Sequence, residues 1–230
     1  MPKPDQSFYL AHFTKDATAT DPQHSKPECV SALDRLVSIL RDRTIRANTI
    51  PWTKRPAACF TECPWSSFLI HANNYSPYGL GFKKSKVYAC GGNPVIYANP
   101  NLFDDQQWDP RVYPYVTPFV PIYAPEEMKN RTPFNGKAID YSHEREWRTI
   151  SDFRFDYQDV CFVILNKVGD LAKIPDDIRE ELGDDKYIFM GMYRRIEEPW
   201  PVHRLEQPGI RIAEESFCKP QVQRQRRRQP

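Results

Sequence analysis

The stretch HEREWRTI, residues 143–150, places several charged side chains directly before an apolar, strand-like pattern. The alternation predicts a β-strand over residues 145–153. In a strand, residues two apart face the same side and lie about 6.5–7 Å apart, so Glu144, Glu146 and Arg148 would share one face. Two carboxylates this close resist ionising together unless a cation or hydrogen-bond donor lies nearby. This pair is therefore the first candidate site.

The composition indicates one globular unit with no strong global charge. The 230 residues are 40% hydrophobic and include 32 basic and 30 acidic side chains, which fits one substantial core and favours neither nucleic acid nor membrane. We expect a single domain over residues 1–215 and a basic, flexible tail over 216–230. Because no signal core or apolar run of about 18–20 residues occurs, we expect a cytoplasmic protein with no membrane contact.

The six cysteines are scattered without a CxxC pair, which is typical of reduced thiols; a zinc site is the alternative. Motifs for dinucleotide-binding loops, P-loops, serine hydrolases and HExxH metalloenzymes are absent from the sequence. Three further stretches carry polar groups in strand-like contexts. LAHFT contains His12, CFTECPW contains Thr61 and Glu62 before a predicted helix that either residue could cap, and YGLGFKK has glycines that indicate close backbone approach.

Periodicity predicts an α+β fold with a mixed or antiparallel sheet. The helix with the clearest apolar stripe covers residues 29–47, opened near Ser25 or Pro27, and a shorter helix covers 174–183. The most apolar strand, 160–167, is expected at the centre of the sheet. The remaining predicted elements are strands at 7–14, 57–62, 80–82, 94–97 and 186–194, helices at 65–72, 102–108 and 124–130, and an irregular insert at about 99–138.

Taken in order, HFT, ACFTECPWSSF, YGLGFKK and HEREWRTI resemble the AbiGi family of abortive-infection, phage-defence proteins over about residues 8–165. The same layout is similar to DarT-type ADP-ribosyltransferases, in which a split β-sheet with flanking helices holds NAD. This second resemblance implies that Glu146 is the catalytic glutamate and Glu144 the acid on the substrate side. It also implies an NAD site formed by His12, Thr14, Phe60, Thr61, Arg55 and Tyr78.

The chemistry of such an enzyme is compatible with these residues. Cleavage of the nicotinamide–ribose bond develops positive charge that a fixed carboxylate stabilises, and a second carboxylate can take a proton from the nucleophile. The pyrophosphate could meet Lys54 and Arg55, but the arginine expected to contact NAD is open between Arg46, Arg55 and Arg148. The acceptor would be RNA or DNA.

Two other functions are compatible with the same sequence. One is a non-catalytic antitoxin or sensor that binds a protein partner, for which the aromatic stretch 108–123 is a candidate interface, although these residues fit a core better. The other is a metal-dependent nuclease that uses His143 with Glu144 and Glu146, a weaker reading because His143 would face the opposite side of the strand.

Overall fold

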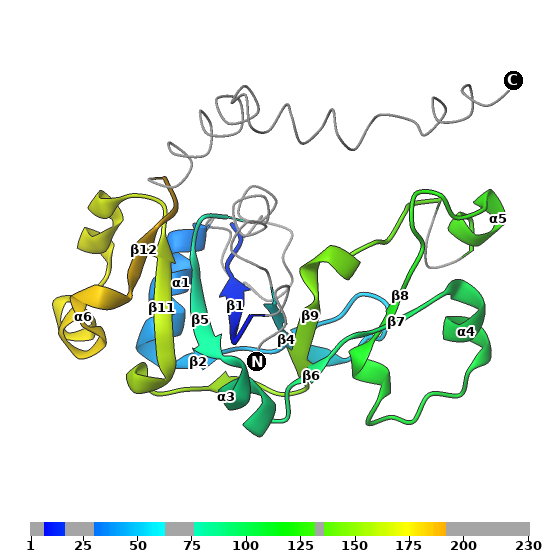
Figure 1. Ribbon diagram of the computed structural model, residues 1–230, viewed down its shortest axis with the longest axis horizontal. Helices are drawn as coiled ribbons and strands as arrows, with labels where there is room; N and C mark the ends of the chain where they lie inside the picture. The colour runs from blue at the N-terminus through cyan, green and yellow to red at the C-terminus, as the bar shows by residue number, and fades with distance from the viewer. Residues whose placement is uncertain (1–6, 17–29, 63–75, 132–135, 192–230) are drawn as a thin grey trace, which may run out of the picture. The chain divides into compact units, whose positions relative to one another are not determined.

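The computed structural model describes residues 7–16, 30–62, 76–131 and 136–191. These residues form a mixed α+β structure, as predicted, whose elements are shown in Figure 1. The predicted helix at 65–72, the domain boundary at 215 and the tail at 216–230 lie outside the described residues. Within the described residues, no helix combines the length and apolar character needed to cross a membrane.

The main sheet has eight strands in the order β12-β11-β5-β1-β4-β9-β6, with β3 paired to β4. Neighbouring strands are antiparallel except β11 and β12, which are parallel, so the sheet is mixed. The strands are β1 (Tyr9–Phe13), β3 (Asn48–Thr49), β4 (Pro56–Thr61), β5 (Gly79–Lys83), β6 (Asn93–Pro94), β9 (Glu146–Thr149), β11 (Val160–Leu165) and β12 (Tyr187–Phe189).

Two smaller two-stranded sheets flank this main sheet. They pair β2 (Thr44–Ile45) with β10 (Phe153–Arg154), and β7 (Ile96–Ala98) with β8 (Val116–Pro118). The α-helices among the described residues are α1 (Ala32–Asp42), α3 (Lys84–Ala89), α4 (Pro100–Asp105), α5 (Glu126–Lys129) and α6 (Asp176–Leu182). Short 3₁₀ turns complete the chain: η1 (Tyr113–Tyr115), η2 (Ser142–Glu144), η3 (Tyr157–Asp159), η4 (Val168–Lys173) and η5 (Asp184–Lys186).

Helix α1 forms where the apolar spacing predicted it, but it is shorter than residues 29–47. It begins after Ser31, whose hydroxyl accepts a hydrogen bond from the Asp34 amide at 3.1 Å, rather than near Ser25 or Pro27. It ends at Arg43, a left-handed residue with φ 46° whose N–H reaches the last carbonyls of the helix. Residues 44–45 then turn into strand β2, so the helical pattern stops at the cap.

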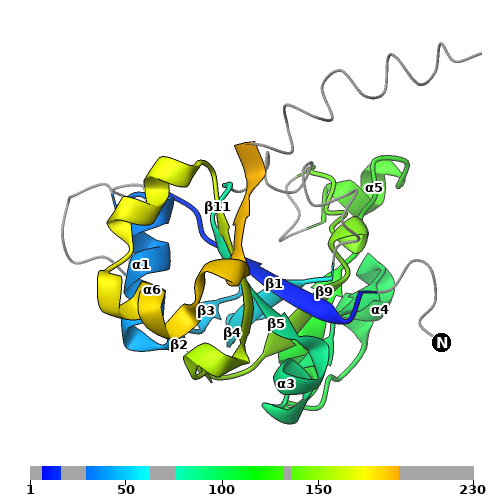
Figure 2. The ribbon, with the colours of Figure 1, turned by 60° about the vertical axis from the view of Figure 1, so that its left-hand side comes forward.

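The main core lies between one face of the sheet and the helices α1 and α6, which Figure 2 shows on the same side of the strands. An aromatic group ties the strands together, since the rings of Phe60 and Phe82 lie 5.1 and 4.9 Å from the ring of Phe153. Leu36 and Leu40 of α1 are fully buried in this core. Each such side chain contributes about 1.5–3 kcal/mol through burial, so this layer contributes strongly to the stability.

Three strand predictions need correction. Strand β11 is buried but lies second from one edge of the sheet, not at the centre, because β12 adds in parallel outside it. The predicted strand at 145–153 is two short strands, β9 and β10, and they pair in different sheets. The predicted strand at 94–97 is likewise divided between β6 and β7.

The predicted irregular insert at 99–138 has a small core of its own. Ala98, Phe103, Val116 and Val120 are buried together, with Trp108 and Tyr113 packed against them. The stretch 108–123 is therefore packed in part, with residues 114, 116–118, 120 and 121 buried and residues 109–112 exposed. At its end, Ile122 and Tyr123 are 81% and 80% exposed.

We expect the glycine at position 79 to be required by the β1–β5 pairing. A Cβ atom placed on Gly79 would lie 2.5 Å from the backbone oxygen of His12, which cannot move without shifting strand β1. Gly79→Ala should therefore lower the free energy of unfolding by about 1–3 kcal/mol, measured by urea denaturation. Gly169→Ala is the control, because a Cβ atom there meets no atom within 4 Å; equal effects at the two positions would contradict this account.

Candidate functional site

A cavity of about 320 Å³ lies where β1, β4 and β9 meet. The segment containing Ile50 and Trp52 and the turn η2 also contribute to its walls. Five of the predicted site residues line it together: His12, Phe60, Thr61, Glu144 and Glu146. The topology therefore brings residues from distant parts of the sequence to one place.

Glu146 forms a two-point ion pair with Arg148. The Nε and Nη2 atoms of Arg148 donate to the two carboxylate oxygens at 2.8 and 2.9 Å. Residues 146 and 148 share one face of β9, as the alternation predicted, so the guanidinium reaches back along its own strand. The side chain of Arg148 is 1% exposed and that of Glu146 12% exposed, which makes this a largely buried pair.

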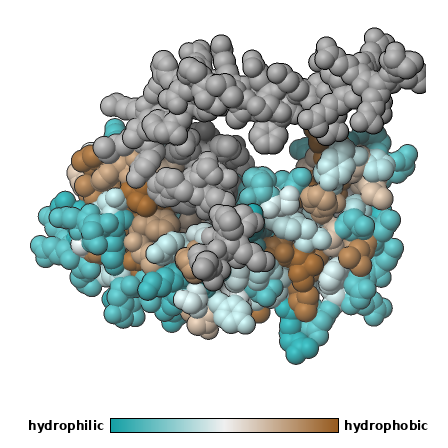
Figure 3. All heavy atoms as spheres, viewed as in Figure 1, coloured by the Kyte–Doolittle hydropathy of each residue, from teal (hydrophilic) through white to brown (hydrophobic). Residues whose placement is uncertain are grey.

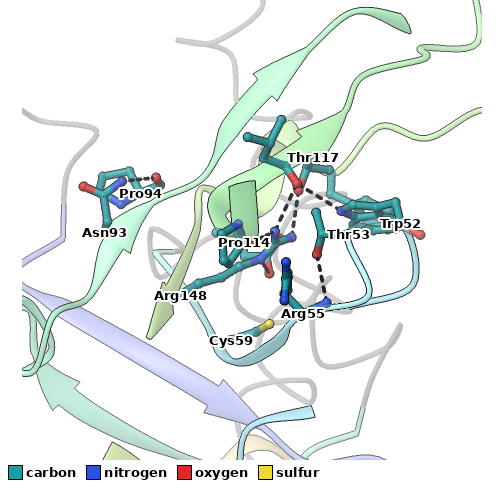
Figure 4. A network of polar contacts seen from close by, with 12 residues as sticks. Trp52, Thr53, Arg55, Cys59, Asn93, Pro94, Pro114, Thr117 and Arg148 are labelled. Atoms are coloured by element: carbon teal, nitrogen blue, oxygen red, sulfur yellow. Dashed lines mark hydrogen bonds and ion pairs between the residues drawn. The ribbon is translucent and has the colours of Figure 1, made fainter. Parts of the chain in front are cut away.

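The rest of the Arg148 guanidinium is also bound, as Figure 4 shows. Nη1 donates to the carbonyl of Pro114 at 2.9 Å, and Nη2 donates to the Thr117 hydroxyl at 2.7 Å. The guanidinium also lies 5.8 Å from the ring centre of Trp52. Desolvation acts to lower the pKa of Arg148, but the hydrogen bonds and charge of Glu146 outweigh it and the pKa is raised.

Glu144 does not lie on the predicted strand. It ends the turn η2, and the next residue, Arg145, has a left-handed φ of 44°, so strand β9 begins only at Glu146. The backbone oxygen of Glu144 accepts a hydrogen bond from the Thr61 hydroxyl at 2.6 Å. Two carboxylates still reach one cavity, but from a turn and a strand rather than from one strand face.

Lys15 also lines this cavity and is a cation close to the acidic side chains. Desolvation lowers the pKa of Lys15, and the negative charge of Glu144 opposes that shift. A neighbouring ammonium group offsets the repulsion between the two carboxylates of the cavity. Together with Arg148, it supplies the cations that the paired glutamates were expected to require.

His12 lies where strands β1 and β4 stop pairing with each other. In the main sheet β1 and β4 share one register pair, Ala11 with Thr61. Two residues before Thr61 on β4, the Cys59 carbonyl instead accepts a hydrogen bond from Nδ1 of His12 at 2.8 Å. Burial lowers the pKa of His12 despite this bond, so the ring is neutral. Since a carbonyl can only accept, Nδ1 carries the proton in this hydrogen bond, and Nε2 is the acceptor nitrogen of the neutral ring.

Two further groups beside the glutamates stay protonated. Burial, reinforced by the Glu146 charge, raises the pKa of Cys59 and of Tyr97. Cys59 is therefore a neutral thiol on the cavity wall and not an activated nucleophile. The Tyr97 hydroxyl donates to the backbone oxygen of Tyr141 at 2.7 Å.

Phe60 and Thr61 contribute mainly to structure. The Phe60 ring is 2% exposed and packs in the aromatic core, with its edge near the His12 ring. The Thr61 hydroxyl donates its hydrogen bond to the Glu144 carbonyl. Both residues thus position β4 beside the cavity.

Three residues predicted to bind NAD are not among the lining residues of this cavity. Thr14 is 4% exposed, and its hydroxyl donates to the Ala32 carbonyl at 2.8 Å, which joins β1 to the start of α1. Tyr78 donates to Asp170 at 3.1 Å, and burial next to that carboxylate raises its pKa to about 12. Arg55 is exposed in the loop before β4. Each has a local role that residue order alone does not reveal.

Glu62 is buried and joins three segments of the described structure. The predicted helix at 65–72, which Glu62 could cap, lies outside the described residues. The Glu62 carboxylate accepts hydrogen bonds from the Ser7 amide at 3.2 Å, from the Lys84 ammonium at 2.5 Å and from the Trp147 indole at 3.2 Å. These partners come from the start of β1, from α3 and from β9. Successive side chains of a strand point to opposite faces, so Trp147 faces away from the side of the sheet that carries Glu146. Its indole meets Glu62 on that opposite side.

Two features of the structure bear on alternatives that the sequence left open. Of Arg46, Arg55 and Arg148, only Arg148 lines the cavity with the glutamates; its position two residues after Glu146 on a strand was the available signal. For the nuclease hypothesis, the described part of the chain holds no group of three His, Cys, Asp or Glu side chains arranged to bind a metal, and His143 is exposed on turn η2.

Comparison with known proteins places the chain among proteins of phage resistance. Residues 38–181, more than half of the chain, match the family described as "Putative abortive phage resistance protein AbiGi, antitoxin". The chain therefore belongs to the AbiGi family, as the motif order indicated. No curated protein and no solved structure matches it, so the likeness to DarT-type ADP-ribosyltransferases stays a prediction.

We expect Glu146 and Arg148 to behave as one unit in unfolding experiments. Removing one partner of a buried ion pair costs about 3–5 kcal/mol, because the other charge is left without compensation. Arg148→Met should reach this range, Glu146→Gln should cost less, and the double variant should cost less than the sum of both. Glu126→Gln is the control, because the Glu126 side chain is 71% exposed in its pair with Lys129. Strict additivity of the two single effects would contradict the coupling.

The lowered pKa of His12 should appear in the pH dependence of stability. The unfolded chain takes up a proton on this side chain as the pH falls below 6.5, and the folded chain resists it. The free energy of unfolding should therefore fall below that pH. His12→Gln should remove this contribution, and His143→Gln, at an exposed position, should retain it. Identical pH profiles for wild type and His12→Gln would contradict the assignment.

Proposed function

We propose that this protein is a non-catalytic antitoxin of an abortive-infection system and acts by binding a protein partner. The family to which it belongs is described as an antitoxin. The observation that carries the proposal is the pairing of Glu146, the predicted catalytic residue, with Arg148. A carboxylate held at both oxygens by a buried guanidinium serves as a counterion, and freeing it for chemistry would leave a buried charge uncompensated.

The dispersal of the predicted NAD-binding residues supports the same proposal. Thr14 and Tyr78 are held by the Ala32 carbonyl and Asp170, and Arg55 is exposed elsewhere. A binding site for NAD would need these polar groups to converge on one ligand. Their separate hydrogen bonds favour a structural role for this sheet, with function on the surface.

The exposed end of the 108–123 stretch is the surface that we assign to the partner. Ile122 and Tyr123 are large apolar side chains at 81% and 80% exposure, fixed next to the buried Val120. Figure 3 shows separate hydrophobic areas among hydrophilic ones on the face in view. Apolar and aromatic side chains presented on a packed base are typical of interface anchors.

A second candidate function is an NAD-dependent ADP-ribosyltransferase toxin that modifies nucleic acid. One observation favours it: Glu144, Glu146 and His12 belong to the lining of one cavity. In that function Glu146 would leave Arg148 and stabilise the charge that develops on the ribose. NAD would be consumed as substrate, and RNA or DNA would be the acceptor.

Growth experiments separate the two functions. An antitoxin should leave growth unchanged when expressed alone in a host without its system, its removal from the native host should arrest growth, and re-expression should restore growth. The double variant Ile122→Asp/Tyr123→Asp should fail to restore growth, because charged groups disrupt an apolar contact. Tyr88→Asp, at a side chain 68% exposed on α3, is the control and should restore growth.

The opposite outcome would support the enzyme. Growth arrest on expression of the wild type alone, lost in Glu146→Gln and accompanied by transfer of label from NAD to nucleic acid, would overturn the antitoxin proposal. The stability of Glu146→Gln must be measured alongside, because the Arg148 ion pair depends on it.

A further inference from the structure

A second cavity, of about 500 Å³, lies along the outer side of helix α1. One wall is the helix face carrying Arg35, Ser38, Ile39 and Asp42, whose spacing of three, one and three residues places them on one side. The core-facing leucines of α1 lie on another side of the helix. The facing wall comes from the end of β1 and from residues 44–48.

The lining of this cavity has an excess of positive charge. Lys15, Arg35 and Arg46 are basic, and Asp42 is the one carboxylate among the lining residues that the structure describes. Asp42 accepts a hydrogen bond from Arg46 at 3.3 Å, with side chains that are 45% and 76% exposed. An ion pair so exposed contributes little, so Arg46 can turn to a ligand at small cost. Guanidinium and ammonium groups grouped in this way are typical of phosphate recognition.

The same cavity also offers apolar surface. Phe13 and Ile45 are buried at its base and Ile39 is half-buried on the helix wall. Ser38 and Asn48 add an exposed hydroxyl and an exposed amide at its rim. Pockets of about 300–1,000 Å³ with apolar walls and a few polar groups are typical of small-molecule sites. An anion with a flat, mainly apolar body matches both properties.

We propose that this second cavity binds a small phosphate monoester with a ring system, of the class of nucleoside monophosphates. The phosphate would lie between Lys15, Arg35 and Arg46, and the ring would lie against Ile39, Ile45 and Phe13. The site shares His12, Phe13 and Lys15 with the first cavity. Occupancy would therefore alter the charge next to Glu144, which gives a physical route for a ligand to influence the glutamate cavity.

Isothermal titration of the full chain with AMP, adenosine and inorganic phosphate tests this proposal. AMP should bind on the order of tenfold more tightly than either fragment, because it uses both the cations and the apolar surface. Its affinity should fall as the salt concentration rises, because the cations are partly exposed. Absence of AMP binding up to millimolar concentration would overturn the proposal, as would equal binding of AMP and phosphate.

A pair of arginine substitutions on one segment identifies the site. Arg46→Gln should weaken AMP binding on the order of tenfold, the effect of losing a charged hydrogen bond, and leave adenosine binding unchanged. Arg46 is largely exposed, so the substitution does not threaten the fold. Arg41→Gln, exposed on α1 and not among the lining residues, should bind AMP as wild type does. Equal binding by the two variants would overturn the assignment, and the antitoxin proposal would stand or fall separately on the growth experiment.

Discussion

The buried guanidinium of Arg148 is the constraint on which the arrangement of β8, β9 and the turn η1 depends. A charge removed from water must find partners for all its donors, and Arg148 finds them in Glu146, Thr117 and the Pro114 carbonyl. Two of these partners belong to the segment at β8 and its preceding turn. The hydrogen bonds from Arg148 to Pro114 and Thr117 therefore join the small core around Val116 and Val120 to strand β9 of the main sheet. The same contact holds both carboxylate oxygens of Glu146, so this residue contributes to the architecture as well as to the cavity wall.

The short pairing between β1 and β4 shapes the cavity in the way that Arg148 shapes the contact between β8 and β9. Strands β1 and β4 pair only at Ala11 and Thr61, and the pairing does not continue to the end of β1. The imidazole of His12 satisfies the Cys59 carbonyl instead, so the strands separate without leaving a buried acceptor unpaired. A histidine in an aromatic strand is commonly a core residue, and here it is a half-buried residue that allows two cavities to adjoin.

The sequence predicted what depends on local pattern and missed what depends on long-range contacts. Apolar spacing located α1, β4, β5, β11 and α6, and strand alternation placed Glu146 and Arg148 on one face. The turn at Arg145, which moves Glu144 out of the strand, depends on a left-handed residue that no glycine marks. The roles of Thr14, Tyr78 and Glu62 were not predictable, because each is decided by a partner at least 18 residues away.

The partners of strand β4 also set the order in which the chain can fold during synthesis. Glu62, at the end of β4, meets Trp147 of β9 across a sequence separation of 85 residues. At about 5–20 residues per second, a ribosome needs roughly 4–17 s to make that interval. During this time the edge of β4 that pairs with β9 lacks its native partner strand. Phe60 and Thr61 lack their cross-strand neighbours Trp147 and Glu146. The nascent chain thus carries an unprotected strand edge for seconds, a period in which a chaperone or a partner could bind it.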